Sequence, residues 1–284
     1  MRLADDLVTG GYLLGPAFRE LNEAVRLHKE AVFSEAVGRM LLARIGELAQ
    51  IAGWIASDAG RYADAERAYT LGMSAAREAG DTTLVANLAG SLAYQHTNTG
   101  RQREGIELAH AAVEEAGPNA PAATRALFLD RVGWAYAKAG EAQPAMRALE
   151  EAHEALVGGD GTPAPEWAYW VTHEELDVMD ARVFTELKRP LRAVPLLTEV
   201  LSRYDATHVR EVALYRSWLA VALADANEPE RAVREAGRIV ELSSCLASER
   251  TAERTRAVLR RLEEYGDVPE VHGLLSANRH LLVA

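Results

Sequence analysis

The chain has 284 residues, of which 49% are hydrophobic and 26% charged, an ordinary composition for a folded globular protein. Its formal net charge of −11 disfavours non-specific binding to nucleic acid or to an anionic membrane surface. The sequence has no run of 18 apolar residues, the length that a membrane-spanning helix needs. Its acidic N-terminus lacks the layout of a signal peptide. The single cysteine, Cys245, excludes an internal disulfide and fits a reducing cytoplasm; we expect it to be a buried structural thiol.

A turn pattern recurs at a nearly constant interval along the chain. Its aligned turn residues are Gly60, Gly100, Gly140, Lys188 and Asn227. The intervals between them are 40, 40, 48 and 39 residues. A period in this range indicates a solenoid, in which each repeat buries its apolar face against its neighbours.

The segments between these turns carry apolar residues at spacings of three and four, which predicts an all-helical chain. We expect N-terminal helices over about 2–30 and from Ser34 into the first repeat, and C-terminal helices over about 248–265 and 268–281. The repeats are expected at 44–81, 84–117, 122–158, 166–206 and 208–246. One continuous solenoid would then comprise an N-terminal cap (1–43), the repeats (44–246) and a C-terminal cap (247–284).

The turn chemistry predicts antiparallel helix pairs. Glycine and asparagine accept the left-handed conformation that ends a helix, and a proline lies near the start of the next helix in the last three repeats. Small residues recur five places after each turn residue, where they would let the two helices approach closely. These residues are Ala65, Gly105, Ala145, Ala193 and Ala232.

Aromatic residues support the same register. Six residues before the turn, the first helix carries an aromatic residue in repeats one to three: Trp54, Tyr94 and Trp134. The same position holds Arg182 in repeat four and Val221 in repeat five. An aromatic residue, then a glycine, then an alanine early in the second helix is a tetratricopeptide pattern. We therefore expect a tetratricopeptide-like right-handed superhelix of about five repeats, each near 40 residues, with longer helices than the usual 34-residue unit has.

Two segments interrupt the helical pattern. Residues 117–121 contain a glycine and two prolines between repeats two and three, and residues 158–165 form a glycine- and proline-rich loop. The second segment accounts for the interval of 48 residues, and we expect it to be a widened loop between repeats rather than a domain linker.

Motifs for catalysis or cofactor binding are absent. The sequence has no glycine-rich dinucleotide or phosphate loop, no His-Glu-x-x-His and no Cys-x-x-Cys, and its eight histidines are scattered. We therefore expect no cofactor, no metal site and no enzymatic activity.

The densest candidate constellation follows the 158–165 loop. If residues 167–182 form one helix, then Trp170, His173, Glu174 and Asp177 share a face, with Arg182 further along. Aromatic rings beside acids and an arginine would suit a peptide, an amine or a polar small molecule. The alternative is that the tryptophans pack between repeats and the acids form a solvated face.

Further polar and aromatic residues lie on the first helices of other repeats. They are Tyr94 and Gln95 in repeat two, Arg131 and Trp134 in repeat three, and Arg216 and Trp218 in repeat five. The first helices of such solenoids line a concave groove, so we expect these residues to contribute to one binding surface. Structural ion pairs are the alternative role for the charged members.

A run of arginines from Arg250 to Arg261 could suggest contact with DNA. Glutamates interrupt this run throughout, a pattern that is typical of an exposed helix with salt bridges. We therefore expect no direct contact with nucleic acid.

Several segments together resemble the tetratricopeptide region of bacterial XRE-type transcriptional regulators. They are 47–62, 91–95, 167–180, 222–230 and 267–271. In that family a helix-turn-helix domain binds DNA, and the helical repeats sense a ligand or partner and mediate self-association. The resemblance implies a regulatory role in the bacterial cytoplasm, with possible homodimerisation.

No helix-turn-helix fits before the first repeat, so the resemblance implies a DNA-binding domain in cis outside this sequence or a separate partner in trans. The predicted function is a regulatory module that binds a peptide, a small molecule or a protein in its concave groove. One alternative is a protein scaffold without a small ligand. Another is a solenoid enzyme that uses His173 with Glu174 or Asp177 as acid and base.

Overall fold

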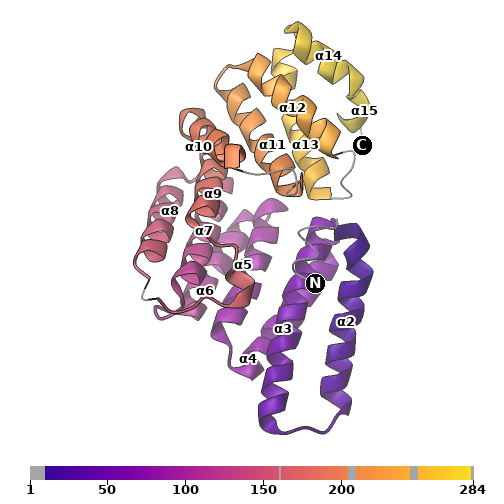
Figure 1. Cartoon of the computed structure of the whole chain (residues 1–284), viewed down its shortest axis with the longest axis vertical. Helices are drawn as coiled ribbons and strands as arrows, with labels where there is room; N and C mark the ends of the chain where they lie inside the picture. Colours follow the sequence, from indigo (N-terminus) through magenta and orange to yellow (C-terminus); the bar gives the residue numbers. More distant parts are fainter. Residues whose placement is uncertain (1–9, 160, 204–208, 244–248, 283–284) are drawn as a thin grey trace. The chain divides into compact units, whose positions relative to one another are not determined.

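The computed structural model describes residues 10–159, 161–203, 209–243 and 249–282, and these residues form helices joined by turns and loops, with no strand among them (Figure 1). The chain divides into two compact units, residues 1–176 (unit 1) and 177–284 (unit 2). The expected burial of Cys245 lies outside the described residues. None of the described helices has the length and apolar character needed to cross a lipid bilayer.

Unit 1 consists mainly of antiparallel helix pairs. Its helices are α2 (Gly10–Glu30), α3 (Glu35–Asp58), α4 (Tyr62–Ala79), α5 (Thr82–Asn98), α6 (Gln102–Ala116), α7 (Ala122–Lys138) and α8 (Ala142–Val157). A short 3₁₀-helix, η1 (Glu166–Ala168), follows. The pairs α3–α4, α5–α6 and α7–α8 pack along their lengths and correspond to the first three predicted repeats. Ser34 caps α3, as its position before the predicted helix indicated.

Unit 2 is also built from helices, including an antiparallel pair. Helix α9 (His173–Glu186) begins at the end of unit 1 and continues into unit 2. The helices that follow are α10 (Pro190–Arg203), α11 (Val209–Asp225), α12 (Pro229–Ser243), α13 (Glu249–Leu262), the 3₁₀-helix η2 (Glu263–Tyr265), α14 (Pro269–Ala277) and α15 (Arg279–Leu282). The pair α11–α12 forms the fifth repeat, and α13 packs against both of its helices.

The five predicted turns share one backbone geometry. All five turn residues have positive φ, including Lys188 at 53° and Asn227 at 61°, which are the two non-glycine residues with positive φ in the described chain. The N–H of the next residue bonds the carbonyl five positions back in each turn, for example Arg101 N to His96 O at 2.9 Å and Arg189 N to Phe184 O at 2.7 Å. This is the Schellman arrangement, which satisfies the last carbonyls of the first helix and reverses the chain.

The small residues after each turn are buried, which confirms their predicted role. The alanines at 65, 145, 193 and 232 have no exposed surface, and Gly105 is buried. A Cβ on Gly105 would lie 2.2 Å from the Oγ1 atom of Thr97 in α5. Helices α5 and α6 therefore approach more closely than even an alanine would allow.

The first helices of the repeats pack on one another within unit 1. Helix α3 contacts α5, and α5 contacts α7, more extensively than α4 contacts α6 or α6 contacts α8. Unit 1 therefore curves with α3, α5 and α7 on its inner side. This inner face is where side chains from successive repeats come together.

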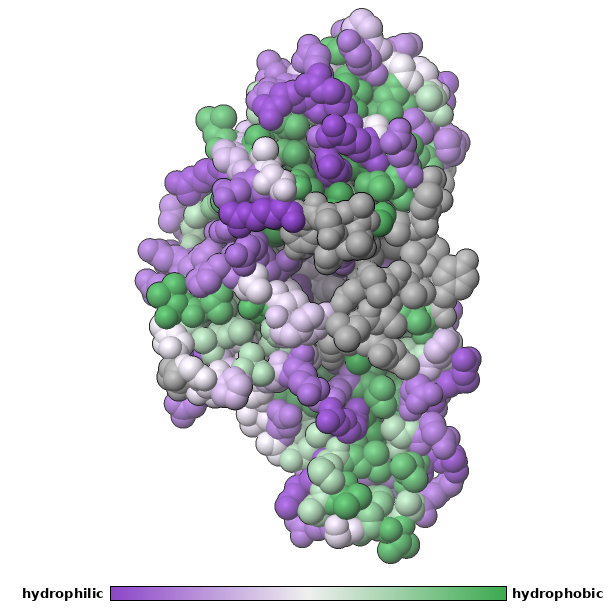
Figure 2. All heavy atoms as spheres, in the orientation of Figure 1, coloured by the Kyte–Doolittle hydropathy of each residue, from purple (hydrophilic) through white to green (hydrophobic). Residues whose placement is uncertain are grey.

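Apolar side chains are exposed at the turn between α2 and α3. Leu27, Val32, Val37 and Met40 are between 43% and 102% exposed, and the same end of unit 1 is strongly hydrophobic in Figure 2. This surface lies at the opposite end of α3 from Trp54.

The fourth repeat differs from its prediction. Residues 167–182 do not form one helix, because η1 covers only residues 166–168 and α9 begins at His173. Thr172 explains the late start: its hydroxyl accepts from Glu175 N at 3.3 Å, as an N-cap does. The expectation that Trp170 shares a helix face with His173, Glu174 and Asp177 is therefore wrong.

Candidate functional site

Three aromatic rings stack across the inner face of unit 1. Trp54 of α3 and Tyr94 of α5 have ring centroids 5.7 Å apart with an interplanar angle of 27°. Tyr94 and Trp134 of α7 follow at 6.3 Å and 31°. All three occupy the position six residues before a turn glycine, so the 40-residue period places one ring on each successive helix. We call this row the aromatic ladder.

Arg131 of α7 adds a positive charge to the ladder. Its guanidinium carbon lies 4.3 Å from the Tyr94 ring centroid and 5.6 Å from that of Trp54. Arg131 is one turn before Trp134 on the same helix, and its side chain is 8% exposed. A guanidinium at this distance from an aromatic face makes a favourable cation–π interaction, which is stronger where water is excluded.

Polar side chains at the ends of α3, α5 and α7 border the ladder. Asn98 accepts a hydrogen bond from the Trp134 indole N–H at 3.2 Å, and the Lys138 ammonium lies 5.8 Å from the Trp134 ring. Asp58 occupies the matching position in α3 and is 5% exposed. Its Oδ2 atom is buried and has no hydrogen-bond partner in the described structure.

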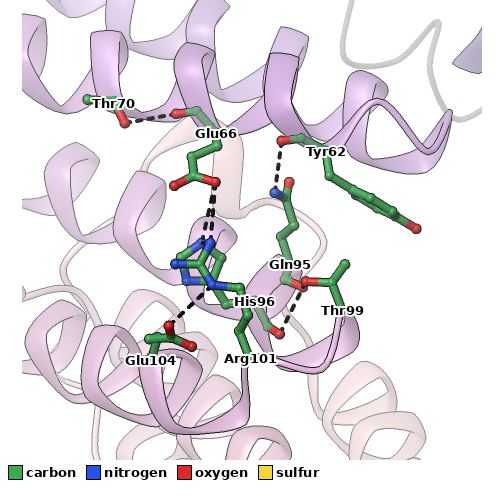
Figure 3. A network of polar contacts seen from close by, with 8 residues as sticks. All are labelled: Tyr62, Glu66, Thr70, Gln95, His96, Thr99, Arg101 and Glu104. Atoms are coloured by element: carbon green, nitrogen blue, oxygen red, sulfur yellow. Dashed lines mark hydrogen bonds and ion pairs between the residues drawn. The ribbon is translucent and has the colours of Figure 1, made fainter.

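Gln95 and its neighbour His96 belong to a separate polar network between α4, α5 and α6 (Figure 3). Gln95 is 3% exposed and donates to the backbone carbonyl of Tyr62 at 3.0 Å. The His96 Nε2 atom lies 3.0 Å from Arg101 Nη1 and 3.8 Å from a Glu66 carboxylate oxygen. Gln95 therefore fastens α5 to α4.

The surroundings of His96 lower its pKa. Burial is the largest cause, because it disfavours the charged imidazolium. The neighbouring Arg101 lowers the pKa further, because it repels a second positive charge. Glu66 and Glu104 act in the opposite direction. The folded chain thus favours the neutral imidazole more than the unfolded chain does.

The structure places Trp170 outside helix α9 and the other predicted residues of this segment within it. Trp170 is partly buried and its indole N–H bonds the Trp167 carbonyl at 3.1 Å, while the Trp167 ring packs on Phe128 of α7 at 6.3 Å. His173 and Glu174 are exposed in the first turn of α9, and Asp177 is partly buried. The packing role that the sequence left open for these tryptophans is the one this geometry supports.

A second aromatic–arginine cluster lies within unit 2. The Trp218 ring of α11 has the guanidinium carbon of Arg254 at 3.4 Å and that of Arg182 at 5.5 Å from its centroid. Arg254 also donates to the Ser217 hydroxyl at 3.1 Å. Arg216 bonds Glu235 of α12 at 2.5 Å, so it takes the structural ion-pair role that was one of its alternatives.

The structure thus brings together three of the predicted site residues, Tyr94, Arg131 and Trp134, and adds Trp54 and Asp58 to them. Trp54 was identified only as a marker of the repeat, although its register with Tyr94 was the signal that it belongs to the same surface. The stacking of Arg254 on Trp218 was missed, because the arginine run in α13 was predicted to be an exposed face. Arg256 forms the predicted salt bridge, with Glu249, but its side chain is only 19% exposed, and Arg261 bonds Asp225 of α11.

Two open cavities among the described residues lie away from the ladder. One of about 620 Å³ is lined by the ends of α6 and α8 and the start of α7, at the other end of α7 from Trp134. Another of about 520 Å³ lies between α12 and α14. The described residues contain no group of three or more His, Cys, Asp or Glu side chains that could hold a metal ion.

These features define an all-helical, tetratricopeptide-like repeat fold with an aromatic inner face in unit 1. Comparison with solved structures agrees: the crystal structure of BtubC (BKLC) from P. vanneervenii matches with a TM-score of 0.55 and 15% sequence identity, over 83% of this chain and 91% of that one. At this level of identity the likeness concerns the fold alone. No protein-family model and no curated protein matches the chain.

Proposed function

We propose that the chain is a non-catalytic binding module that captures a peptide segment on the aromatic ladder of unit 1. The observation that carries this proposal is the row of three rings on consecutive helices of the inner face. Trp54 and Tyr94 remain partly exposed, so a ligand can reach them. Aromatic and arginine side chains are the residue types that contribute most to binding at protein interfaces.

The spacing of the ladder favours an extended peptide over a compact ligand. Successive rings are 5.7 and 6.3 Å apart. Side chains on one face of an extended chain recur every two residues, or about 6.6 Å. One peptide could therefore present successive side chains of one face to Trp54 and Tyr94, the two rings of the ladder that are partly exposed.

The regulatory setting comes from the resemblance to the repeat region of XRE-type regulators. In the proposed mechanism, the peptide favours one arrangement of the repeats or of a dimer, and a DNA-binding partner responds. The peptide can shift this equilibrium only by the difference between its affinities for the two states. Sedimentation velocity of the chain with and without a selected peptide tests whether binding changes its self-association.

A random peptide display library panned against the whole chain tests the binding function. Peptides selected on the native chain should bind Tyr94→Ala at least about tenfold more weakly, because loss of a hot-spot aromatic costs about 2 kcal/mol or more and tenfold corresponds to about 1.4 kcal/mol. Tyr136→Ala is the matched control: Tyr136 is also a partly buried tyrosine, but its hydroxyl lies 2.9 Å from His110 Nε2. Equal binding to Tyr94→Ala and the native chain, or no selected peptide, would contradict the proposal.

A further inference from the structure

The Asp58 carboxylate is in an unfavourable place for an unpaired negative charge. Asp58 is the last residue of α3, where unpaired backbone carbonyls already make the helix end negative. It is 5% exposed, and its buried Oδ2 atom accepts no hydrogen bond from any described residue. A buried charge without a partner destabilises a fold, and such groups cluster at functional sites.

The equivalent positions of other repeats show what Asp58 lacks. Two residues before the turn, Asn98 of α5 reaches the next first helix and bonds the Trp134 indole. Asp225 of α11 occupies the same register position and bonds the Arg261 guanidinium of α13 at 2.6 Å. In these two repeats the position bonds a donor on a later helix, the Trp134 indole N–H for Asn98 and the Arg261 guanidinium for Asp225. Asp58 offers the same carboxylate as Asp225, but its Oδ2 atom has no bonding partner among the described residues.

Three arginines on the same repeats have partners other than Asp58. Arg61 pairs with Asp64 at 2.5 Å, and Arg101 lies 3.4 Å from Glu66 and from Glu104. Arg131 stacks over Tyr94. Among the residues that the structure describes, none of these three arginines forms an ion pair with Asp58.

The surroundings of Asp58 suit a cation. Trp54 lies one helical turn before Asp58, so both side chains project from the same face of α3. An aromatic ring beside a carboxylate favours a positive charge through cation–π attraction and ion pairing together. The net charge of −11 also draws cationic ligands toward the protein.

We infer that Asp58 and Trp54 form a subsite for a cationic side chain of the bound peptide, with arginine preferred because its planar guanidinium can pair with the carboxylate and stack on the indole. This inference rests on the proposed function and deepens it. It predicts that the natural ligand carries a basic residue at the Trp54 end of the ladder.

The test uses N-acetyl-arginine N-methylamide as the probe, with the citrulline analogue as an uncharged probe of the same shape. The native chain, Asp58→Asn and the control Asp64→Asn are titrated while the Trp54 indole N–H signal is followed by NMR. Asp64 is a suitable control because it pairs with Arg61 and Arg67 on α4. The arginine probe should shift the signal saturably, whereas citrulline and Asp58→Asn should each lower the affinity at least about tenfold, as loss of a buried charge pair does. Asp64→Asn should change it less than about twofold.

Two results would overturn the inference: an arginine probe that causes no saturable shift, or one that binds Asp58→Asn as it binds the native chain. Thermal unfolding without a probe adds an independent readout. Asp58→Asn should raise the midpoint, because it removes a buried charge that has no partner; a lower midpoint would show that the carboxylate has a structural role and would also overturn the inference.

The outcomes separate this inference from the proposed function. Selected peptides that depend on Tyr94 but contain no basic residue, and bind Asp58→Asn normally, would leave the peptide-binding function standing and refute the cation subsite. If the arginine probe binds the native chain but not Asp58→Asn, and the library yields no Tyr94-dependent peptide, the cation subsite would stand and the peptide-binding function would be refuted.

Discussion

The guanidinium of Arg131 lies over the ring of Tyr94, 4.3 Å from its centroid, and so joins helix α7 to helix α5 on the inner face of unit 1. Trp54 and Trp134 flank the same tyrosine. The Arg131 guanidinium and the three aromatic rings thus form contacts that link three successive repeats. The contact joins two repeats, and the same rings form the surface that we propose binds a peptide.

Replacing Arg131 with methionine should lower the free energy of unfolding by about 1–2 kcal/mol, because the apolar stem is largely kept while a desolvated cation–π contact is lost. Arg131→Lys should lose part of that amount, since an ammonium keeps the charge but cannot stack as a plane. Urea unfolding followed by circular dichroism measures both. A smaller loss in the methionine variant than in the lysine variant would show that the stacked guanidinium contributes nothing.

The turn at Lys188 should become more stable when glycine replaces the lysine. Lys188 adopts φ 53°, a left-handed conformation that is unfavourable for a side chain with a Cβ atom. Lys188→Gly should therefore gain about 0.5–1 kcal/mol, measured as a rise in the thermal midpoint.

Gly140→Ala is the matched reverse change. Gly140 has φ 78° and a Cβ there would meet nothing within 4 Å, so the loss of about 1 kcal/mol would come from the backbone alone. If both variants shifted the midpoint in the same direction, the conformational explanation of these turns would be wrong.

The positions of these turns were predictable from sequence, because the residues that permit a left-handed helix end recur every 39–48 residues. The ladder was predictable in part, since a residue's place on a helix face follows from helical period alone. Gln95 shows the limit: its side chain bonds Tyr62 O, a partner that depends on the packing of α4. Asp58 shows a second limit, because whether its carboxylate finds a hydrogen-bond donor depends on which side chains the packed helices place beside it.

Gly105→Ala should destabilise the α5–α6 pair by about 1–3 kcal/mol, as overpacking of a tight core contact does. The added Cβ would lie 2.2 Å from Thr97 Oγ1, 3.0 Å from Thr97 N and 3.1 Å from Ala93 O. Gly237→Ala in α12 is the control, because a Cβ there meets nothing within 4 Å and alanine favours a helix by up to about 1 kcal/mol. The two variants should move the unfolding midpoint in opposite directions, and a tolerated Gly105→Ala would show that these helices can separate freely.

His96 should make the stability of unit 1 depend on pH. Burial and Arg101 lower its pKa in the folded state, so the unfolded chain binds a proton at a higher pH than the folded chain does. The contribution of His96 is therefore constant above its ordinary pKa of about 6.5, and stability falls as the pH drops from there toward the lowered folded value. His96→Gln should flatten this part of the profile.

Glu66→Gln should steepen the same part of the profile, because Glu66 raises the pKa of His96 and its loss would lower that pKa further. Thermal midpoints of the native chain and the two variants between pH 8 and pH 5 measure the effect, and parallel profiles for the native chain and His96→Gln would assign the acid sensitivity to other groups.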